Sequence, residues 1–161
     1  MTHPVTVVLA STPLFKIQIS IPQNFTRKDV VRTKGLVVEL FTFNDAYCQV
    51  QTIIDYTKPI TASGCLKACQ ENLSRDYTNI EIIEDAAEVL GWFPTNHKLI
   101  MAYNDSTNNN QREVMVMQFF QNSAYTCSGF FYAVPVAHYQ TTDAAVQQVK
   151  SFIKQNCKIL P

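Results

Sequence analysis

Three apolar segments separated by short polar runs dominate the second half of the chain. They span residues 99–103, 113–120 and 125–134 and contain many of the β-branched and aromatic residues that strands favour. The run between the first two, 104–111, is rich in Asn and contains Asp, Ser and Thr, a composition typical of a hairpin turn. Connections this short leave no room for a crossover helix, so we expect the three strands to pair antiparallel.

The segment 113–120 is apolar at consecutive positions rather than at every second one. Side chains of a strand point alternately to its two faces, so this segment carries apolar groups on both. They are Met115, Met117 and Phe119 on one face and Val114, Val116 and Phe120 on the other. A sheet that is apolar on both faces is covered on both. We therefore predict an α+β fold in which helices flank both faces of a central, mostly antiparallel β-sheet, an α/β/α sandwich.

Two segments have the periodicity of amphipathic helices and are expected to supply the covering layers. Residues 63–75 begin with Ser63 as the predicted N-cap. Residues 143–155 follow a Thr-Thr-Asp cap sequence. The apolar stripes of the two helices are Leu66, Cys69 and Leu73 in the first and Val146, Val149, Phe152 and Ile153 in the second.

The remaining segments read mostly as strands. Two stretches are ambiguous. Residues 26–31 are predicted to form a single helical turn. For residues 84–90 a short helix is an alternative to a strand, because Asp85-Ala86-Ala87-Glu88 has high helix propensity. The other strands are expected at 4–11, 14–21, 36–43, 47–56 and 79–84, with 87–93 continuing or pairing with the last.

Length and composition indicate one ordinary globular domain over residues 1–161. The chain is 47% hydrophobic and 16% charged with a net charge of zero, and its 13 Lys and Arg residues are scattered, so we expect no binding to nucleic acid. No apolar run approaches the roughly 20 residues of a membrane span. Because no positive residue precedes the apolar segment 4–11, we interpret it as a strand rather than a secretory leader. We expect a cytoplasmic protein, with a periplasmic or secreted protein whose leader is absent from this sequence as the alternative.

The cysteines offer candidate chemistry that the pattern does not favour. Their odd number makes reduced, buried thiols the default, with one or two disulfides left open; they are Cys48, Cys65, Cys69, Cys127 and Cys157. Cys65 and Cys69 share a helix face, as half of a metal site or a redox pair would, but no second pair of ligands follows at metal spacing. We interpret both as small core residues.

Catalysis by a thiol would require Cys65 or Cys127 to meet His97 or His138. Cys127 falls in the middle of an apolar strand, where a thiol usually behaves as a small hydrophobic group. We therefore predict no catalytic residue, no metal and no cofactor, and expect that the protein is not an enzyme.

Two aromatic loops and one acidic cluster remain as candidate binding surfaces. Trp92 and Phe93 lie in a bend between Gly91 and Pro94, and His138 and Tyr139 lie in the loop before the last helix. Exposed aromatic residues on loops often mark partner surfaces, so these four are the candidate partner-binding residues. The acidic residues are interpreted as a solvated face, with a weakly bound cation or a basic partner as alternatives; they are Glu81, Glu84, Asp85 and Glu88.

The order of these segments resembles the PsbP-like/DcrB-like group of proteins with the Mog/PsbP-type fold. The resemblance covers most of the chain from residue 15 to 153 and rests on packing signals. They are the strand 17–21 ending at Pro22, Asn24-Phe25, Gly91 before the strand 99–103, the segments 116–120 and 125–132, and the final helix closing on Ser151-Phe152. The chain departs from the group at Gln23, where a glycine is expected, and in its cysteines.

The resemblance implies a non-enzymatic, protein-binding scaffold and carries over no catalytic residue. The group includes photosystem extrinsic subunits, a Ran-binding nuclear import factor, bacterial envelope lipoproteins and chaperones of type VI secretion effectors. We thus expect an adaptor or chaperone that binds another protein and is a monomer or weak homodimer. A small-molecule or lipid carrier, with a pocket lined by the Met- and Phe-rich strands, is the alternative, and a thiol-dependent enzyme is less favoured.

Overall fold

The computed structural model describes residues 5–11, 16–88 and 96–161, and its strands form two sheets. The larger sheet has seven strands in the order β3-β4-β5-β9-β8-β7-β6, and the smaller has three in the order β1-β2-β10. Every pairing between neighbouring strands is antiparallel. The prediction of a mostly antiparallel α+β fold is confirmed.

The elements follow one another along the chain with short connections. Their bounds are β1 Val5–Ser11, β2 Lys16–Ile21, β3 Thr26–Thr33, β4 Leu36–Phe43, β5 Ala46–Ile54, α1 Ala62–Ser74, β6 Tyr77–Glu88, β7 Asn96–Asp105, β8 Gln111–Ser123, β9 Thr126–Pro135, the 3₁₀ turn η1 Val136–His138, α2 Thr142–Asn156 and β10 Cys157–Leu160.

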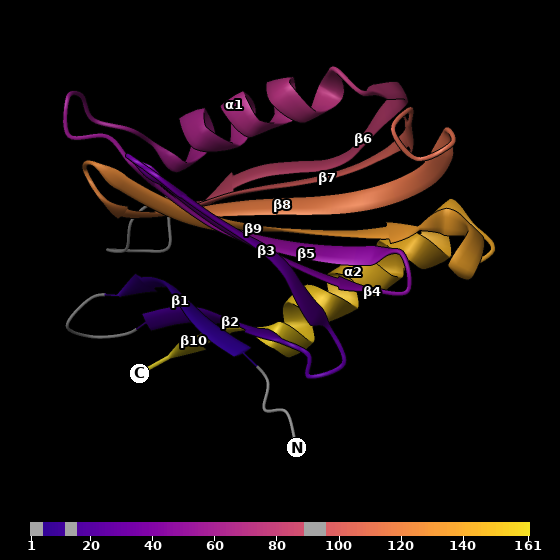
Figure 1. The fold of residues 1–161 in the computed structure, drawn as a ribbon, viewed down its shortest axis with the longest axis horizontal. Coiled ribbons are helices and arrows are strands. Elements are labelled where there is room, and N and C mark those ends of the chain that lie inside the picture. The colour runs from indigo at the N-terminus through magenta and orange to yellow at the C-terminus, as the bar shows by residue number, and fades with distance from the viewer. Residues whose placement is uncertain (1–4, 12–15, 89–95) are drawn as a thin grey trace.

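The large sheet separates two apolar cores, as the two-faced pattern of 113–120 predicts. On one face, Met115, Met117 and Phe119 pack with the buried side of α1. On the other, apolar residues of β8 such as Val116 pack with α2 and with β1 and β2. Figure 1 shows α1 on one side of the large sheet, and α2 and the small sheet on the other.

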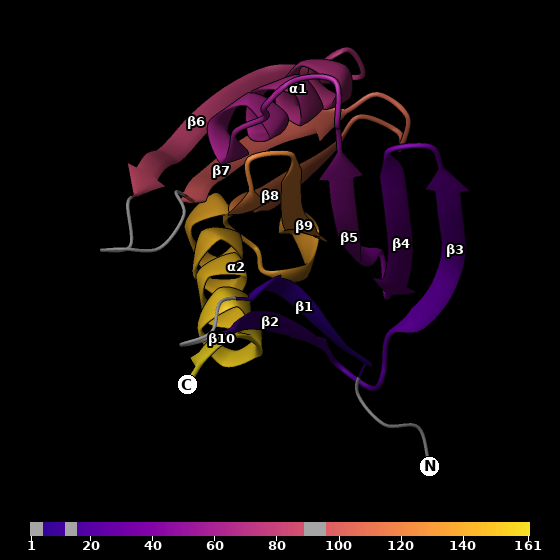
Figure 2. The same cartoon turned by 90° about the vertical axis from the view of Figure 1, so that its left-hand side faces the viewer.

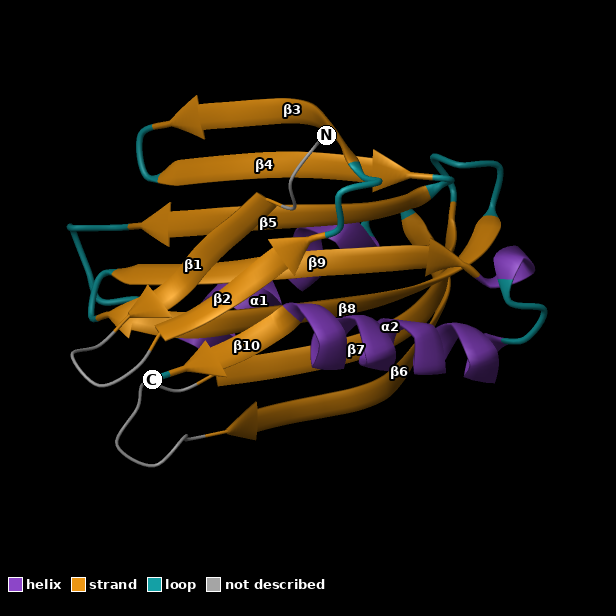
Figure 3. Ribbon diagram, turned by 90° about the horizontal axis from the view of Figure 1, so that it is seen from below, coloured by secondary structure: helices purple, strands orange, loops and turns teal. Residues whose placement is uncertain are grey.

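The second covering layer is mixed rather than purely helical. Figure 3 shows β1, β2 and β10 crossing the large sheet beside α2. Ile17, Ile19 and Ile21 of β2 are fully buried in the same core as Val149 and Phe152 of α2. The sequence did not predict β10, whose four residues follow α2 directly and pair with β2.

The helical turn predicted at 26–31 is wrong, and over the described residues 79–88 the predicted strand forms rather than its helical alternative. Residues 26–31 belong to β3, which pairs with β4 through a short hairpin at Gly35. Residues 84–88 belong to β6, which pairs with β7, so the short helix does not form there. In both cases, pairing to a neighbouring strand outweighs the local helix propensity.

Both amphipathic helices form where their periodicity predicts, and threonines cap them. Thr61, rather than the predicted Ser63, caps α1: its Oγ1 accepts a hydrogen bond from the Gly64 backbone N–H at 3.0 Å. Thr141 caps α2 in the same way, through the N–H of Ala144 at 3.1 Å.

Candidate functional site

The seven-stranded sheet carries an apolar surface at its β3–β4 end that belongs to neither core. Val31 of β3 lies opposite Val38 of β4, and Val38 lies opposite Gln51 of β5. Leu36 and Leu40 flank Val38 on the same face, because side chains two residues apart in a strand share a face. We call these four apolar residues, Val31, Leu36, Val38 and Leu40, the open face.

The open face lies on the same side of the sheet as α1. The Gln51 amide Nε2 donates a hydrogen bond to the Cys69 sulfur of α1 at 3.0 Å, so the side chain of Gln51 points toward the helix. Residues directly opposite each other in an antiparallel pair share a face, which places Val38 on that side too. α1 itself packs over β6, β7, β8 and β9. Figure 2 shows β4 and β3 extending past the helix.

Burial of the open-face residues is incomplete. Val31 is 41% exposed, and Leu36, Val38 and Leu40 are half-buried. The open face continues into a groove of about 690 Å³ at the end of β4 and β5, where Leu36, Ile53, Ile54 and Tyr56 form the walls. Tyr56 is 77% exposed. Apolar side chains on a contiguous solvated surface are typical of a partner site.

Of the four sequence-predicted partner residues, the structure describes two, and these two do not lie at the open face. Trp92 and Phe93 fall outside the described residues. His138 and Tyr139 line a separate pocket of about 290 Å³ on the other side of the sheet, next to α2 and the β4–β5 turn. The His138 Nε2 atom lies 3.9 Å from an Asp45 carboxylate oxygen in that turn.

Aromatic rings form the walls of the His138 pocket. The Phe25 and Phe43 rings lie 5.8 Å apart, and Phe25 is 6.5 Å from the buried Tyr132 ring. Asn44 and Asp45, both at positive φ, form the turn that brings Phe43 to the pocket edge. Asn and Asp tolerate this conformation better than other non-glycine residues, so the sequence predicts the turn at this point but not the pocket.

The Met and Phe side chains of β7 and β8, which the carrier hypothesis placed around a pocket, pack in the core instead. Met101, Met115, Met117 and Phe119 have no exposed surface and fill the core beneath α1. They line neither the groove nor the His138 pocket.

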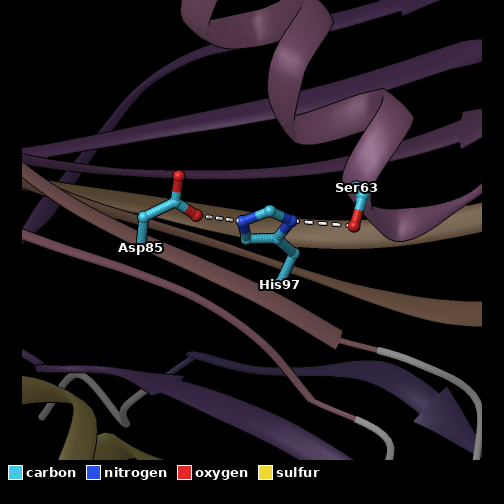
Figure 4. Close-up of polar contacts among 3 residues, drawn as sticks. All are labelled: Ser63, Asp85 and His97. Atoms are coloured by element: carbon cyan, nitrogen blue, oxygen red, sulfur yellow. Dashed lines mark hydrogen bonds and ion pairs between the residues drawn. The ribbon is translucent and has the colours of Figure 1, made fainter.

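A chain of three polar side chains connects β6, β7 and the start of α1. The His97 Nδ1 atom lies 2.8 Å from the Ser63 hydroxyl, and Nε2 contacts an Asp85 carboxylate oxygen. Figure 4 shows the imidazole between the other two side chains. The sequence did not predict this cluster, because the three residues are distant in the chain and match no local motif.

The candidate Cys–His pairs do not form hydrogen bonds in the described structure. His97 is engaged by Ser63 and Asp85, and His138 lies with Asp45. Cys65 lies on the buried side of α1, and Cys69 packs at the edge of the same core. Both positions agree with the interpretation of these cysteines as core residues. Among the described residues, no three His, Cys, Asp or Glu side chains converge as a metal site.

The described residues of the predicted acidic cluster are divided among four basic partners, of which Lys98 and Lys150 both approach Glu84. Glu84 lies 3.0 Å from the Lys98 ammonium, and this contact lowers the pKa of the Glu84 carboxyl. Glu81 lies 3.5 Å from Arg112, and Asp85 contacts His97. Nothing is described of the Glu88 side chain. The three described carboxylates therefore do not form a single acidic patch.

The described helices include none with the length and apolar character needed to cross a bilayer. Comparison with models of protein families finds no match. Comparison with curated protein sequences finds no match either.

Comparison with solved structures does find similar folds over almost the whole chain. The Ran-binding protein Mog1p of Saccharomyces cerevisiae is 12% identical, with a TM-score of 0.57, and the match covers 96% of this chain and 92% of Mog1p. The cyanobacterial PsbP protein CyanoP of Synechocystis is 13% identical, with a TM-score of 0.57, and the match again covers 96% of this chain and 92% of the other. At this identity the likeness concerns the fold. The chain has the Mog/PsbP-type fold, as the resemblance in its sequence implied.

Proposed function

We propose that this protein is a non-enzymatic protein-binding module, an adaptor or chaperone, that binds an amphipathic helix of its partner on the open face. The observation that carries the proposal is the incomplete burial of Val31, Leu36, Val38 and Leu40, which belong to neither core although the adjoining half of the same face is covered by α1.

The dimensions of the uncovered area favour a helix as its occupant. Neighbouring strands lie about 4.8 Å apart, so β3 to β5 spans roughly 10 Å. An α-helix with its side chains is about 10 Å wide. One helix could therefore lie beside α1 and bury its apolar stripe on the open face, as α1 does on β6 to β9.

The polar groups bordering the open face are uncharged on the α1 side. The Gln49 amide donates to Gln51 Oε1 at 3.2 Å, and Gln51 donates onward to Cys69. Gln51 is 6% exposed, so its amide is held in place. A partner helix lying beside α1 would thus be separated from it by two uncharged amide side chains rather than by a charged residue.

The comparison with Mog1p supports a protein partner in a general way. Mog1p is described as a Ran-binding protein, which shows that this fold can serve protein binding. The partner of the present chain is proposed only by its chemistry, an amphipathic helix. We propose the cytoplasm as the compartment, because the odd number of cysteines, five, makes reduced thiols the default.

The Ser63–His97–Asp85 cluster does not favour hydrolysis, although it contains the residue types of a catalytic triad. A hydrolytic serine needs backbone N–H donors to stabilise an oxyanion. At the start of α1, the N–H groups of Ala62, Gly64 and Cys65 already donate to protein oxygens. We therefore propose that His97 ties α1 to the sheet. A fluorophosphonate probe should leave Ser63 unlabelled; labelling that Ser63→Ala abolishes would overturn the proposal that the protein is not an enzyme.

A photo-crosslinking experiment tests the open face directly. The chain carrying a photoreactive amino acid at position 38 is irradiated in extracts of the native host, and the crosslinked peptide is sequenced. We expect a peptide with apolar residues at helical spacing, and we expect Val38→Glu to abolish binding of that protein. Ile159→Glu is the matched control, because Ile159 is a 59% exposed apolar residue on β10 of the small sheet.

Three outcomes would overturn the proposed surface. One is undiminished binding by Val38→Glu when its circular dichroism and unfolding midpoint match the wild type. Another is a crosslinked peptide without helical periodicity. The third is a crosslink to a second copy of this chain, which would make the open face a homodimer interface.

The His138 pocket supports a second candidate function, a carrier of a small uncharged molecule. Its volume of about 290 Å³ is near the lower limit for ligand pockets, and Phe25, Phe43 and Tyr132 form an aromatic wall. Native mass spectrometry of protein purified from its host without denaturation should then show a bound mass that Phe25→Ala removes. Protein of unmodified mass under those conditions would exclude a tightly held ligand.

A further inference from the structure

β3 forms one edge of the large sheet, and its outer side pairs with no described strand. It pairs with β4 alone, and seven of its eight residues are exposed. Figures 2 and 3 show β3 at the end of the sheet with β4 on its inner side. In an antiparallel pair, alternate residues direct their backbone N–H and C=O groups away from the neighbouring strand. The outer side of β3 therefore presents backbone donors and acceptors to solvent.

The outer side of β3 is less obstructed than that of β6, the strand at the opposite edge. The register of β6 with β7 is interrupted twice within residues 78–84. Bulges of this kind twist an edge strand and limit further pairing. The register of β3 shifts once, between Arg27 and Asp29, and its pairing with β4 is then continuous from 29 to 33. This regular stretch is the part of the edge that could accept another strand.

The β3 edge is basic. Residues 27–34 contain a single acidic residue, Asp29, and four basic ones, in a chain whose net charge is zero; the basic residues are Arg27, Lys28, Arg32 and Lys34. Arg27 is held by Glu39 of β4, with 3.1 Å between Nη2 and a carboxylate oxygen. The other three form no ion pair with a described residue. Three cations at this edge are thus available to an acidic partner.

The charged and apolar side chains of β3 lie on different faces. Arg27 lies opposite Phe41, which is buried in the core shared with α2, and its Cζ atom is 5.7 Å from the centre of the Phe41 ring. Arg32 lies opposite Val37, four residues before Phe41 in β4, and so shares that face. Val31 points to the opposite side, with the open face. A strand added to β3 would therefore have alternate side chains beside the arginines and beside Val31.

We propose that the outer side of β3 pairs with an extended segment of another protein in which acidic and apolar residues alternate. Backbone hydrogen bonds along residues 29–33 would hold the added strand, and its carboxylates would lie next to Arg32 and the flanking lysines. The Val30 N–H now donates to the Asp29 carboxylate at 2.8 Å, and a carbonyl of the added strand would replace that carboxylate. The basic residues also oppose pairing of two copies through β3, because like charges on facing strands repel.

An extended peptide fits this edge better than nucleic acid does. Val30 and Val31 lie between the cations, and they suit apolar side chains rather than a continuous row of phosphates. The inference goes beyond the proposed function and does not depend on it. A partner helix would pack on the side chains of the open face, whereas an added strand would bond to the backbone at the edge. Either interaction can succeed when the other fails.

Titration of the full chain with fluorescent synthetic peptides tests the proposal. The probe is a short peptide that alternates Glu with Val and Thr. One control has Lys in place of every Glu, and a second has the same composition with its Glu residues next to one another. Fluorescence anisotropy should show tight binding of the alternating acidic peptide alone. Its affinity should fall as the salt concentration rises from about 20 to about 200 mM, because exposed charges are screened.

Variants locate the binding site. Arg32→Glu should weaken binding of the alternating peptide about tenfold at low salt, because attraction by an exposed cation is replaced by repulsion. Asp29→Asn should strengthen binding, because it removes the acidic residue of this edge. Lys16→Glu is the matched control and should leave the affinity unchanged, since Lys16 is an exposed cation on β2 of the small sheet. Hydrogen–deuterium exchange should slow at residues 29–33 in the complex and stay unchanged in β6.

Several results would overturn the proposal. They are the absence of binding at millimolar peptide, equal binding of either control peptide, an unchanged affinity of Arg32→Glu, and unchanged exchange at residues 29–33 under saturating peptide. Equally tight binding of a single-stranded DNA oligonucleotide would also overturn it, because the edge would then be a general anion-binding surface.

Discussion

Replacing Glu113 by glutamine should increase the stability of this protein at neutral pH. Glu113 lies near the start of β8 and is only 3% exposed. Its Oε2 atom accepts long hydrogen bonds from Gln111 at 3.2 Å and Asn108 at 3.4 Å, while Oε1 has no partner among the described residues. The Tyr103 hydroxyl likewise has none there. Burial, and then the nearby charge of Asp105, raise the pKa of the Glu113 carboxyl.

The sign of the effect follows from linkage. A carboxyl whose pKa is raised on folding binds its proton more tightly in the folded state. Its contribution to stability is therefore fully present below its ordinary value of 4.5 and is lost as pH rises through the raised folded pKa. Glutamine has no charge to desolvate, and its amide can donate a hydrogen bond. A buried polar group without a partner costs about 1–3 kcal/mol of stability. We therefore expect the free energy of unfolding of Glu113→Gln to exceed that of the wild type by this amount at neutral pH.

Denaturant unfolding across the acid-to-neutral range measures this effect. The difference in unfolding free energy between Glu113→Gln and the wild type should shrink as pH falls from the raised folded pKa toward 4.5 and should stay constant below 4.5. Glu84→Gln is the matched control of opposite sign, because the Lys98 ammonium lowers the pKa of Glu84 and the stabilisation is lost on acidification. Glu84→Gln should cost about 0.2–1 kcal/mol at neutral pH. A Glu113→Gln protein that is destabilised equally at every pH would refute the reasoning.

Three further substitutions test packing, capping and the open face. Gly129→Ala should destabilise the sheet by about 1–3 kcal/mol, because the added Cβ would lie 2.6 Å from the Phe119 ring, and an unchanged urea midpoint would contradict this. Thr141→Ala should cost about 1 kcal/mol by removing the cap of α2, measured by thermal unfolding, with Thr141→Ser as the variant that retains it. Val38→Thr should stay within about 0.5 kcal/mol of the wild type in urea unfolding. By contrast, Val116→Thr should lower the free energy of unfolding by about 1–3 kcal/mol, because Val116 is fully buried. Equal destabilisation by Val38→Thr and Val116→Thr would show that the open face is part of a core.

The sequence predicted most of the secondary structure where one local signal was strong. Apolar residues at consecutive positions of 113–120 required two covered faces, and the Asn-rich run before it required a hairpin turn. The same reasoning failed at 26–31, where seven of the eight residues of β3 are exposed and the strand carries little apolar signal. Its strand state comes from pairing with β4, a contact that no local pattern records.

The candidate sites depended on tertiary structure for a similar reason. Val31, Leu36, Val38 and Leu40 look like ordinary core residues in the sequence, because hydrophobicity does not reveal which part of a sheet α1 covers. The spacing of the cysteines suggested a pairing of Cys65 with Cys69 on one helix face, whereas packing of α1 on the sheet places Cys65 in the same buried core as Cys127 of β9.

The sequence by itself determined the fold class, the two-faced sheet and the two amphipathic helices, because each depends on a periodicity within a few residues. Only the tertiary structure decided which strands of the sheet α1 covers and which distant side chains pack beneath it. Those contacts join residues far apart in the chain, and their geometry depends on the packing of whole elements rather than on local sequence.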